Sequence, residues 1–191
     1  MKVRRTTKTD ININQLKVGD TISFNLRDGE KVKAKAVKRE DGKMLMHFVD
    51  CLKDEYPMNE TDTNEGGFEK SELCRVLNTE IIDRFPDEII KYILPDQHKN
   101  LLFLPTIEEV CGLNSKFEKT EGQLSAYKRP KNRIKTLGRD GYSTWYWLRS
   151  PSDYSSYRGQ CFCLVNTVGS ANNDGAGNAY GVAPAFYLAI E

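Results

Sequence analysis

The sequence has few of the residues that metal and catalytic sites commonly use. It holds two histidines, His47 and His98, and neither lies near a cysteine pair at the spacing of zinc ligands. His47 stands inside the apolar run MLMHFV, so we expect it to pack within a strand. The five cysteines are scattered and odd in number, which favours reduced thiols buried as small hydrophobic side chains. We therefore expect no metal site and no cofactor.

The common catalytic and nucleotide-binding motifs are also missing. The sequence contains no GxSxG, GxxxxGK[ST] or GxGxxG pattern. Glu108 and Glu109 are better explained as the acidic start of a helix, although paired carboxylates from distant positions remain open. The segment ANNDGAGN carries one carboxylate, Asp174, and does not match a calcium loop. These absences favour a protein that is not an enzyme.

The chain lacks long apolar runs and an excess of one charge. No run approaches the roughly 20 apolar residues of a membrane-spanning helix, and no apolar segment follows Met1 as in a signal peptide. The net charge is +1, which does not indicate nucleic-acid binding. We expect synthesis in the cytoplasm, no membrane insertion and no nucleic-acid partner. Residues 1–15 are predicted to be a basic N-terminal extension and residues 16–191 a single domain.

Short alternating and apolar segments predict an α+β fold with antiparallel strands, short helices and long C-terminal loops. In KVKAKAVK the lysines are expected on a solvated face that also discourages pairing at a sheet edge. The Asp-Gly pairs at 28–29 and 41–42 predict two-residue type I′ turns. A buried strand is expected at residues 101–105. Helices are expected after Ser71, after Pro86 and after Thr106, where Glu109 would complete a capping box and Gly112 would end the helix.

Residues 150–181 differ from the rest of the chain in composition. They are rich in Tyr, Ser, Asn, Asp and Gly, the residue types of an antibody paratope. CFCLV interrupts this segment and VAPAFYLAI follows it, and because both need burial, a disordered tail is not favoured. We predict two loops, after Pro151 and after Asn166, that strands hold up as one ligand-binding surface. The predicted contact residues are Asp153, Tyr154, Ser155, Ser156, Tyr157, Arg158, Asn166, Ser170, Asn172, Asn173, Asp174, Asn178 and Tyr180.

Three of these residues, Tyr154, Tyr157 and Tyr180, are interpreted as rigid anchors that face the ligand. Their replacement by alanine is therefore predicted to abolish binding and to leave the melting temperature nearly unchanged.

The order of these segments resembles a known family. WYWLRSP, FCLVN and GVAPAFYL, separated by polar stretches, are similar to the C-type-lectin-like domains of phage and bacterial proteins, and in particular to the variable proteins of diversity-generating retroelements. LKVGDTISF, SELCRVLNTEIIDRF and LFLPTIEEV agree, so the resemblance extends from about Leu16 to the end. Two departures stand out: Ala183 occupies a position that is usually Arg, and the calcium-ligand motifs of sugar-binding lectins are absent, which argues against calcium-dependent carbohydrate binding.

The resemblance implies that an error-prone reverse transcriptase rewrites the 3′ end of the gene at adenines. The contact residues would then be among the diversified positions within about 150–181. The fixed scaffold would comprise Trp145, Trp147, Leu148, Arg149, Phe162, Leu164 and Phe186.

The expected function is thus non-enzymatic binding of a protein or cell-surface ligand, in phage receptor recognition or surface display, with a virion-associated location in a phage tail. Two alternatives stay open. The first is an enzyme related to the formylglycine-generating enzymes, in which Cys161 and Cys163 would be reactive. The second is a structural subunit of a phage or prophage assembly, in which the loops would form the subunit interface.

Overall fold

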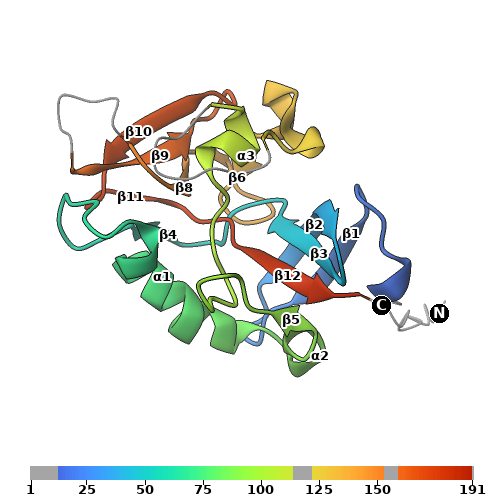
Figure 1. Cartoon of the computed structure of the whole chain (residues 1–191). Helices are drawn as coiled ribbons and strands as arrows, with labels where there is room; N and C mark the ends of the chain where they lie inside the picture. The colour runs from blue at the N-terminus through green and yellow to red at the C-terminus, as the bar shows by residue number, and fades with distance from the viewer. Residues whose placement is uncertain (1–12, 114–121, 153–158, 191) are drawn as a thin grey trace, which may run out of the picture.

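The computed structural model describes residues 13–113, 122–152 and 159–190, and two five-stranded sheets dominate it (Figure 1). Sheet A has the order β1-β2-β3-β12-β5, and sheet B has the order β10-β9-β8-β11-β4. All described strand pairs are antiparallel except β8 with β11. Together with a few short helices, this is the predicted α+β class with antiparallel strands.

The strands of each sheet come from distant parts of the chain. Sheet A is formed by β1 (Thr21–Asn25), β2 (Lys31–Glu40), β3 (Lys43–Phe48), β5 (Ile93–Leu94) and β12 (Ala185–Ala189). Sheet B is formed by β4 (Glu55–Pro57), β8 (Tyr146–Pro151), β9 (Cys161–Val165), β10 (Ala171–Gly175) and β11 (Ala179–Gly181). A small two-stranded sheet is formed by β6 (Lys135–Thr136) and β7 (Ser143–Thr144).

The helices begin where their capping residues predict, and the helix after Thr106 also ends as predicted, whereas the helix expected from Pro86 to Pro95 ends at Ile90. α1 (Glu72–Val76) starts at Ser71, whose hydroxyl accepts from the backbone N–H of Cys74. It continues through a π turn, and α2 (Asp87–Ile90) follows Pro86. α3 (Ile107–Cys111) carries the predicted capping box and ends at Gly112 in the left-handed conformation. In Figure 1 the green segment from α1 to α2 runs below the two sheets.

Three local predictions are wrong. Residues 101–105 form no strand and contribute only the isolated bridge between Phe103 and Ala185. The connection at residues 26–30 is longer than a two-residue turn. Residues 41–42 do join two paired strands directly, but among the described residues of this turn only Gly42 has a positive φ, whereas a type I′ turn needs two.

The long loop expected after Asn166 is mostly sheet. Residues 171–175, with the sequence ANNDG, form β10 and pair with β9 along their whole length. Asn, Asp and Gly disfavour strands, but the fully buried β9 supplies a hydrogen-bonding partner that outweighs this preference.

The lysine-bearing strand is not an edge strand. β2 pairs with β1 on one side and with β3 on the other, so Lys31, Lys33 and Lys35 do not protect a sheet edge as predicted. The outermost strand of this side of sheet A is β1, as Figure 1 shows.

His47 is buried, as predicted, and is held on both sides. Its Nε2 lies 3.1 Å from the carbonyl oxygen of Ala183 and its Nδ1 lies 2.5 Å from the hydroxyl of Tyr127. Because a carbonyl only accepts, Nε2 carries the hydrogen and Nδ1 accepts from Tyr127. Burial and then the nearby Lys135 hold the pKa of His47 well below its usual 6.5.

This neutral histidine predicts a pH dependence of stability. The unfolded chain takes up a proton at this residue as the pH falls through about 6.5, and the folded chain does not, so stability decreases by about 1.4 kcal/mol per pH unit there. Urea unfolding at pH 7 and pH 5 measures the slope. His47→Gln keeps a donor and an acceptor and should remove this part of the slope; an unchanged slope would contradict the assignment.

Candidate ligand-binding surface

The structure places the predicted contact residues in two groups. Residues 153–158, which hold six of the thirteen, lie outside the described residues. The other seven lie within residues 161–181, which comprise β9, β10 and β11 and are called the C-terminal hairpin. Asn166 and Ser170 lie in the turn between β9 and β10, Asn172, Asn173 and Asp174 on β10, Asn178 in the next turn and Tyr180 on β11. Figure 1 shows this hairpin in red at the upper left.

Asn166 builds the turn in which it stands. Its side-chain oxygen accepts from the backbone N–H groups of Val168 and Ser170, at 3.1 and 2.9 Å. Its own backbone N–H donates to the carbonyl of Ser170. The side chain of Ser170 is exposed, whereas Asn166 is half-buried. Asn166 therefore has a structural role, and Ser170 is the residue of this turn that a ligand reaches more freely.

Tyr180 packs against the aromatic residues of β8 and the residue before it. Its ring stacks on Trp145 with centroids 5.9 Å apart and meets Trp147 edge to face at 5.2 Å. Its hydroxyl donates to the carboxylate of Asp174. Burial, followed by this bond, raises the pKa of Tyr180 to about 12. Tyr180 and Asp174 thus fasten β11 to the end of β10.

This packing changes the expected effect of removing Tyr180. Tyr180→Ala loses ring contacts and a hydrogen bond, so we expect it to lower the free energy of unfolding by about 1–3 kcal/mol, not to leave it nearly unchanged. Tyr180→Phe isolates the hydroxyl and should cost about 1 kcal/mol. Urea denaturation measures both. Equal stability of Tyr180→Ala and the unmodified protein would show that the ring is not part of the core.

The side chains of β10 cover the free edge of their own strand. The hydrogen-bonded pairs at either end of the hairpin, Asn166 with Ser170 and Ala176 with Gln160, direct the amides of Asn173 and Gly175 away from β9. These two outward amides donate instead to side-chain oxygens of the preceding residues, Asn172 and Asp174. Exposed backbone donors invite pairing with other chains, so this edge is partly satisfied within the molecule.

The strand ends from which the two predicted loops start lie at opposite ends of the sheet. β8, β9 and β10 form an antiparallel meander, in which successive connections lie at opposite ends. Pro151 at the end of β8 therefore lies at one end of β9, near Cys161, and the turn after Asn166 lies at the other end. The described contact residues thus do not form a pair of neighbouring loops. Five of them lie on edge strand β10 or in the turn before it, whereas Tyr180 lies on β11, which β9 and β8 separate from β10 in the sheet.

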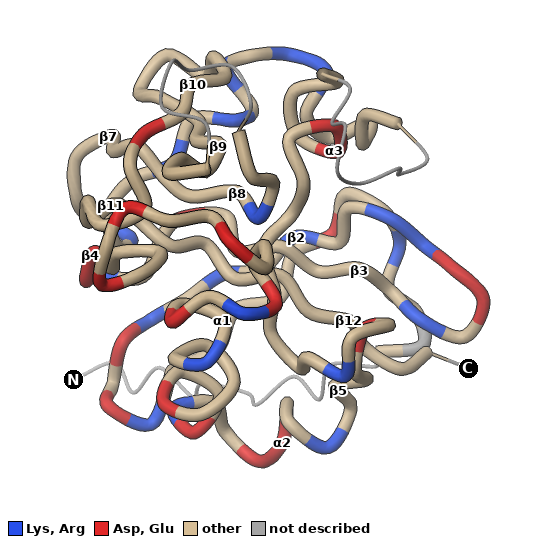
Figure 2. The backbone as a smooth tube through the Cα atoms, turned by 60° about the vertical axis from the view of Figure 1, so that its left-hand side comes forward, with Lys and Arg blue, Asp and Glu red and all other residues tan. Residues whose placement is uncertain are grey.

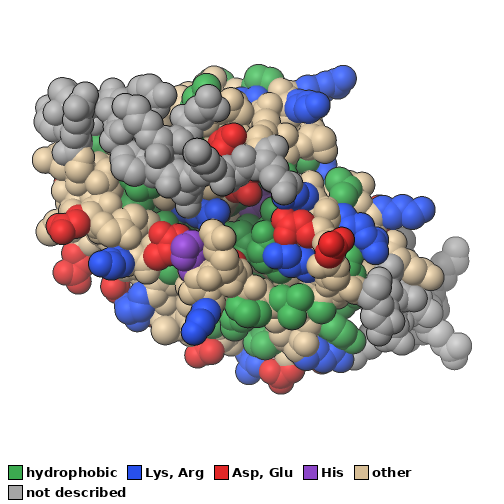
Figure 3. Space-filling view, viewed as in Figure 1, with side chains coloured by type: hydrophobic (Ala, Val, Ile, Leu, Met, Phe, Trp, Pro, Cys, Tyr) green, Lys and Arg blue, Asp and Glu red, His purple; other side chains and the backbone are tan. Residues whose placement is uncertain are grey.

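A hollow of about 250 Å³ lies next to Pro151, and no feature of the sequence predicted it. It is lined by Asn64, Gly66, Gly67, Phe68, Glu69, Arg149 and Pro151. Asn64 fixes one wall, because its backbone and side-chain amides donate to the carbonyls of Gly159 and Cys161. No local pattern marks this site, since its walls come from segments about 85 residues apart. On the face of the molecule seen in Figure 3, basic and acidic side chains are intermixed.

Nothing in the sequence predicted that Lys135 is buried. Its ammonium group donates to the carbonyls of Phe48 and Val49 and lies 5.4 Å from the ring centre of Tyr146. Burial lowers the pKa of Lys135 to about 8. These bonds connect β6 to the end of β3, which gives Lys135 a structural role.

Metal ligands and thiols among the described residues bear on an enzymatic function. The described residues contain no group of three His, Cys, Asp or Glu side chains placed to hold a metal ion. Cys161 and Cys163 are buried on β9. None of the described helices is long and apolar enough to cross a membrane.

Thiol labelling of the native protein checks this arrangement. Cys111 is only half-buried, whereas the other four thiols are buried. Burial also raises the pKa of the Cys111 thiol, so even this residue should react slowly at neutral pH. We expect one slow labelling phase at Cys111 and none at Cys161 or Cys163. Rapid modification of either of the latter would revive the formylglycine-generating-enzyme alternative.

Comparison with known proteins gives one match. A family model described as "Domain of unknown function (DUF6273)" matches residues 40–190. No curated protein and no solved structure matches the chain.

Proposed function

The chain belongs to the DUF6273 family, whose description names no activity, and from its own residues we propose that it is a non-enzymatic ligand-binding protein. Its binding surface is formed by the C-terminal hairpin and the segment after Pro151, on a C-type-lectin-like scaffold of the kind found in variable proteins of diversity-generating retroelements. The ligand is a protein or a cell-surface molecule, bound in phage receptor recognition or surface display.

The burial of the motif residues supports this proposal. Trp147, Leu148, Phe162, Leu164 and Phe186 are completely buried, as the resemblance implies for a constant scaffold. Trp145 and Arg149 are half-buried and lie next to Tyr180 and the hollow, respectively. The residues that would stay constant are therefore mostly those whose replacement would open cavities.

The observation that carries the proposal is the contrast between two adjacent strands. All five residues of β9 are buried, whereas β10, paired to it, carries the half-buried Asn173 and the exposed Asn172. Ser170 and Asn178 are exposed in the turns on either side. The buried strand β9 thus holds a band of small polar side chains along the outer edge of β10, with Asn172 and Asn173 projecting from opposite faces of the strand. Such side chains form adaptable hydrogen bonds at little cost in conformational entropy.

A display library tests whether this band can act as a variable binding surface. Positions 153–158, 170, 172, 173 and 178 are randomised with Asp174 and Tyr180 kept constant, and the variants are selected on yeast against egg-white lysozyme and against streptavidin. We expect folded, protease-resistant variants and different binders for each target. Surface substitutions away from packed groups change stability by only about 0.5 kcal/mol.

The matched control library randomises ten exposed positions elsewhere, centred on the outer face of α1 and the turns that follow it. Arg75, Thr79, Glu80 and Asp83 are exposed residues of this region. Equal yields of binders from both libraries, or unfolding of most hairpin variants, would contradict the proposal.

A further inference from the structure

The outer edge of β1 presents backbone groups that pair with no other described strand. Bonds from Leu26 N to Glu30 O and from Ala36 N to Asp20 O fix which residues of this strand face β2. By the alternation of antiparallel pairs, the N–H and C=O groups of Thr21, Ser23 and Asn25 point away from β2. No described residue hydrogen-bonds to them. This edge differs from β10, whose outward amides are covered by Asn172 and Asp174.

A row of lysines lies beside this edge on one face of the sheet. Lys31, Lys33 and Lys35 stand directly opposite Asn25, Ser23 and Thr21, and directly opposite residues share a face. None of the three lysines forms an ion pair or a side-chain hydrogen bond with a described residue.

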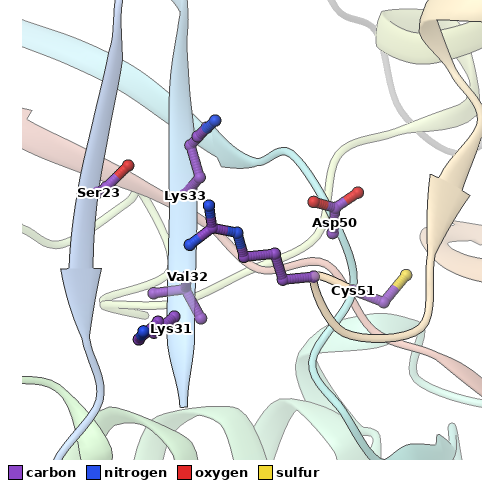
Figure 4. Close-up of a pocket in the computed structure, with 7 residues that line it drawn as sticks. Ser23, Lys31, Val32, Lys33, Asp50 and Cys51 are labelled. Atoms are coloured by element: carbon purple, nitrogen blue, oxygen red, sulfur yellow. The ribbon is translucent and has the colours of Figure 1, made fainter. Parts of the chain in front are cut away.

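Arg139 adds a fourth positive charge to this face. Together with Ser23, Lys31 and Lys33 it lines a hollow of about 40 Å³ that also reaches Asp50. Figure 4 shows Lys33 and Asp50 on different walls of this hollow. Asp50, the only carboxylate of the lining, already accepts from the hydroxyl of Thr136 at 3.0 Å. The face therefore carries a surplus of positive charge although the whole chain is nearly neutral.

We propose that the β1 edge binds an extended acidic segment of a partner protein as an added strand, with carboxylates at alternate positions facing Lys31, Lys33 and Lys35. Same-face residues of any extended strand repeat every 7 Å or so, which is also the repeat of the three lysines. An added strand would lie about 5 Å from β1 and about 10 Å from β2. A lysine ammonium on its four-carbon stem spans this second distance toward a carboxylate.

The charge pattern distinguishes this partner from three alternatives. Lysines that guard an edge lie on the edge strand itself, whereas β1 carries no charged residue. A second copy of β1 would bring two lysine rows together, and like charges side by side are unfavourable. A single-stranded nucleic acid would stack its bases on aromatic side chains, and β1 and β2 present none on this face.

The position of this edge in the chain agrees with a separate interaction surface. β1 and nearly all of β2 precede residue 40, where the shared family domain begins. Sheet B, which carries the proposed variable surface, contains neither strand. The β1 edge therefore offers a second contact, independent of the C-terminal hairpin, such as attachment to a carrier protein.

Fluorescence anisotropy of a labelled peptide with alternating Thr and Glu, added to the full chain, tests the proposal. We expect saturable binding that weakens as salt increases. Replacing all three of Lys31, Lys33 and Lys35 with Gln should weaken it about tenfold or more. The matched control replaces Lys91, Lys128 and Lys131, which are exposed elsewhere, and should leave binding unchanged.

Backbone variants separate strand pairing from simple charge attraction. Ser23→Pro removes an outward N–H without breaking a bond to β2, so it should abolish binding while Ser23→Ala retains it. Two further peptides carry N-methyl groups at alternate residues, one at the Thr positions and the other at the Glu positions. Only the peptide whose methyl groups point away from β1 should still bind. Equal binding by Ser23→Pro, with its melting temperature maintained, would overturn the proposal. So would tighter binding of a heparin fragment or single-stranded DNA than of the peptide, or no binding at low salt.

Discussion

Replacement of Trp147 by alanine is expected to lower the free energy of unfolding by about 3–5 kcal/mol, the largest effect of any single substitution considered. Trp147 is fully buried, and its ring meets Tyr180 edge to face. Its indole N–H donates to the carbonyl of Tyr56 at 2.8 Å and so holds edge strand β4. Truncation would leave a large cavity and remove this hydrogen bond between β8 and β4.

Urea unfolding of Trp147→Ala measures this effect, and Tyr142→Ala is its control because Tyr142 is 70% exposed. The control should change stability by less than about 0.5 kcal/mol. Trp147→Phe retains part of the packing but loses the hydrogen bond, so it should fall between the two. A loss below about 1 kcal/mol in Trp147→Ala would show that this ring does not support the hairpin.

Gly169→Ala is expected to destabilise the protein by about 2–4 kcal/mol, through two effects that add. Gly169 has a φ of 79°, which L side chains rarely adopt. A Cβ atom there would also lie 2.1 Å from the carbonyl oxygen of Pro130. Either the turn that carries Asn166 and Ser170 or the segment around Pro130 would have to move.

Gly159 provides a matched control for this substitution. Its φ of 86° is similar, but no described residue lies within 4 Å of the position that its Cβ would occupy. Gly159→Ala should therefore cost only the backbone term, about 1 kcal/mol. The difference between the two variants measures how tightly the hairpin turn is packed on Pro130. Equal losses would contradict that contact.

Local signals in the sequence were sufficient for much of the fold. Ser71, Thr106 with Glu109, and Gly112 act through neighbours within a few residues, so their caps could be predicted directly. Strict alternation likewise identified β2. The class of the fold followed from these elements, because short strands and helices at these spacings have few ways to pack.

The candidate site was less predictable because its interactions join distant residues. Composition indicated a polar, solvent-facing segment but gave no sign that β9 would recruit residues 171–175 as a strand. The contacts of Tyr180 with Trp145 and Asp174 depend on the curvature of sheet B. Whether a lysine row lies on an edge or on the second strand depends on strand order, which periodicity does not determine.

The sequence of this gene in independent isolates, together with its flanking DNA, tests the proposed variable surface most directly. We predict that codons for Ser170, Asn172 and Asn178 differ between isolates while those for Trp147 and Phe162 do not. A near-copy of this segment should lie beside a reverse-transcriptase gene, with mismatches at adenines. If residues 150–181 are as constant as the rest of the chain and no such copy exists, the C-terminal hairpin is not a diversified binding surface.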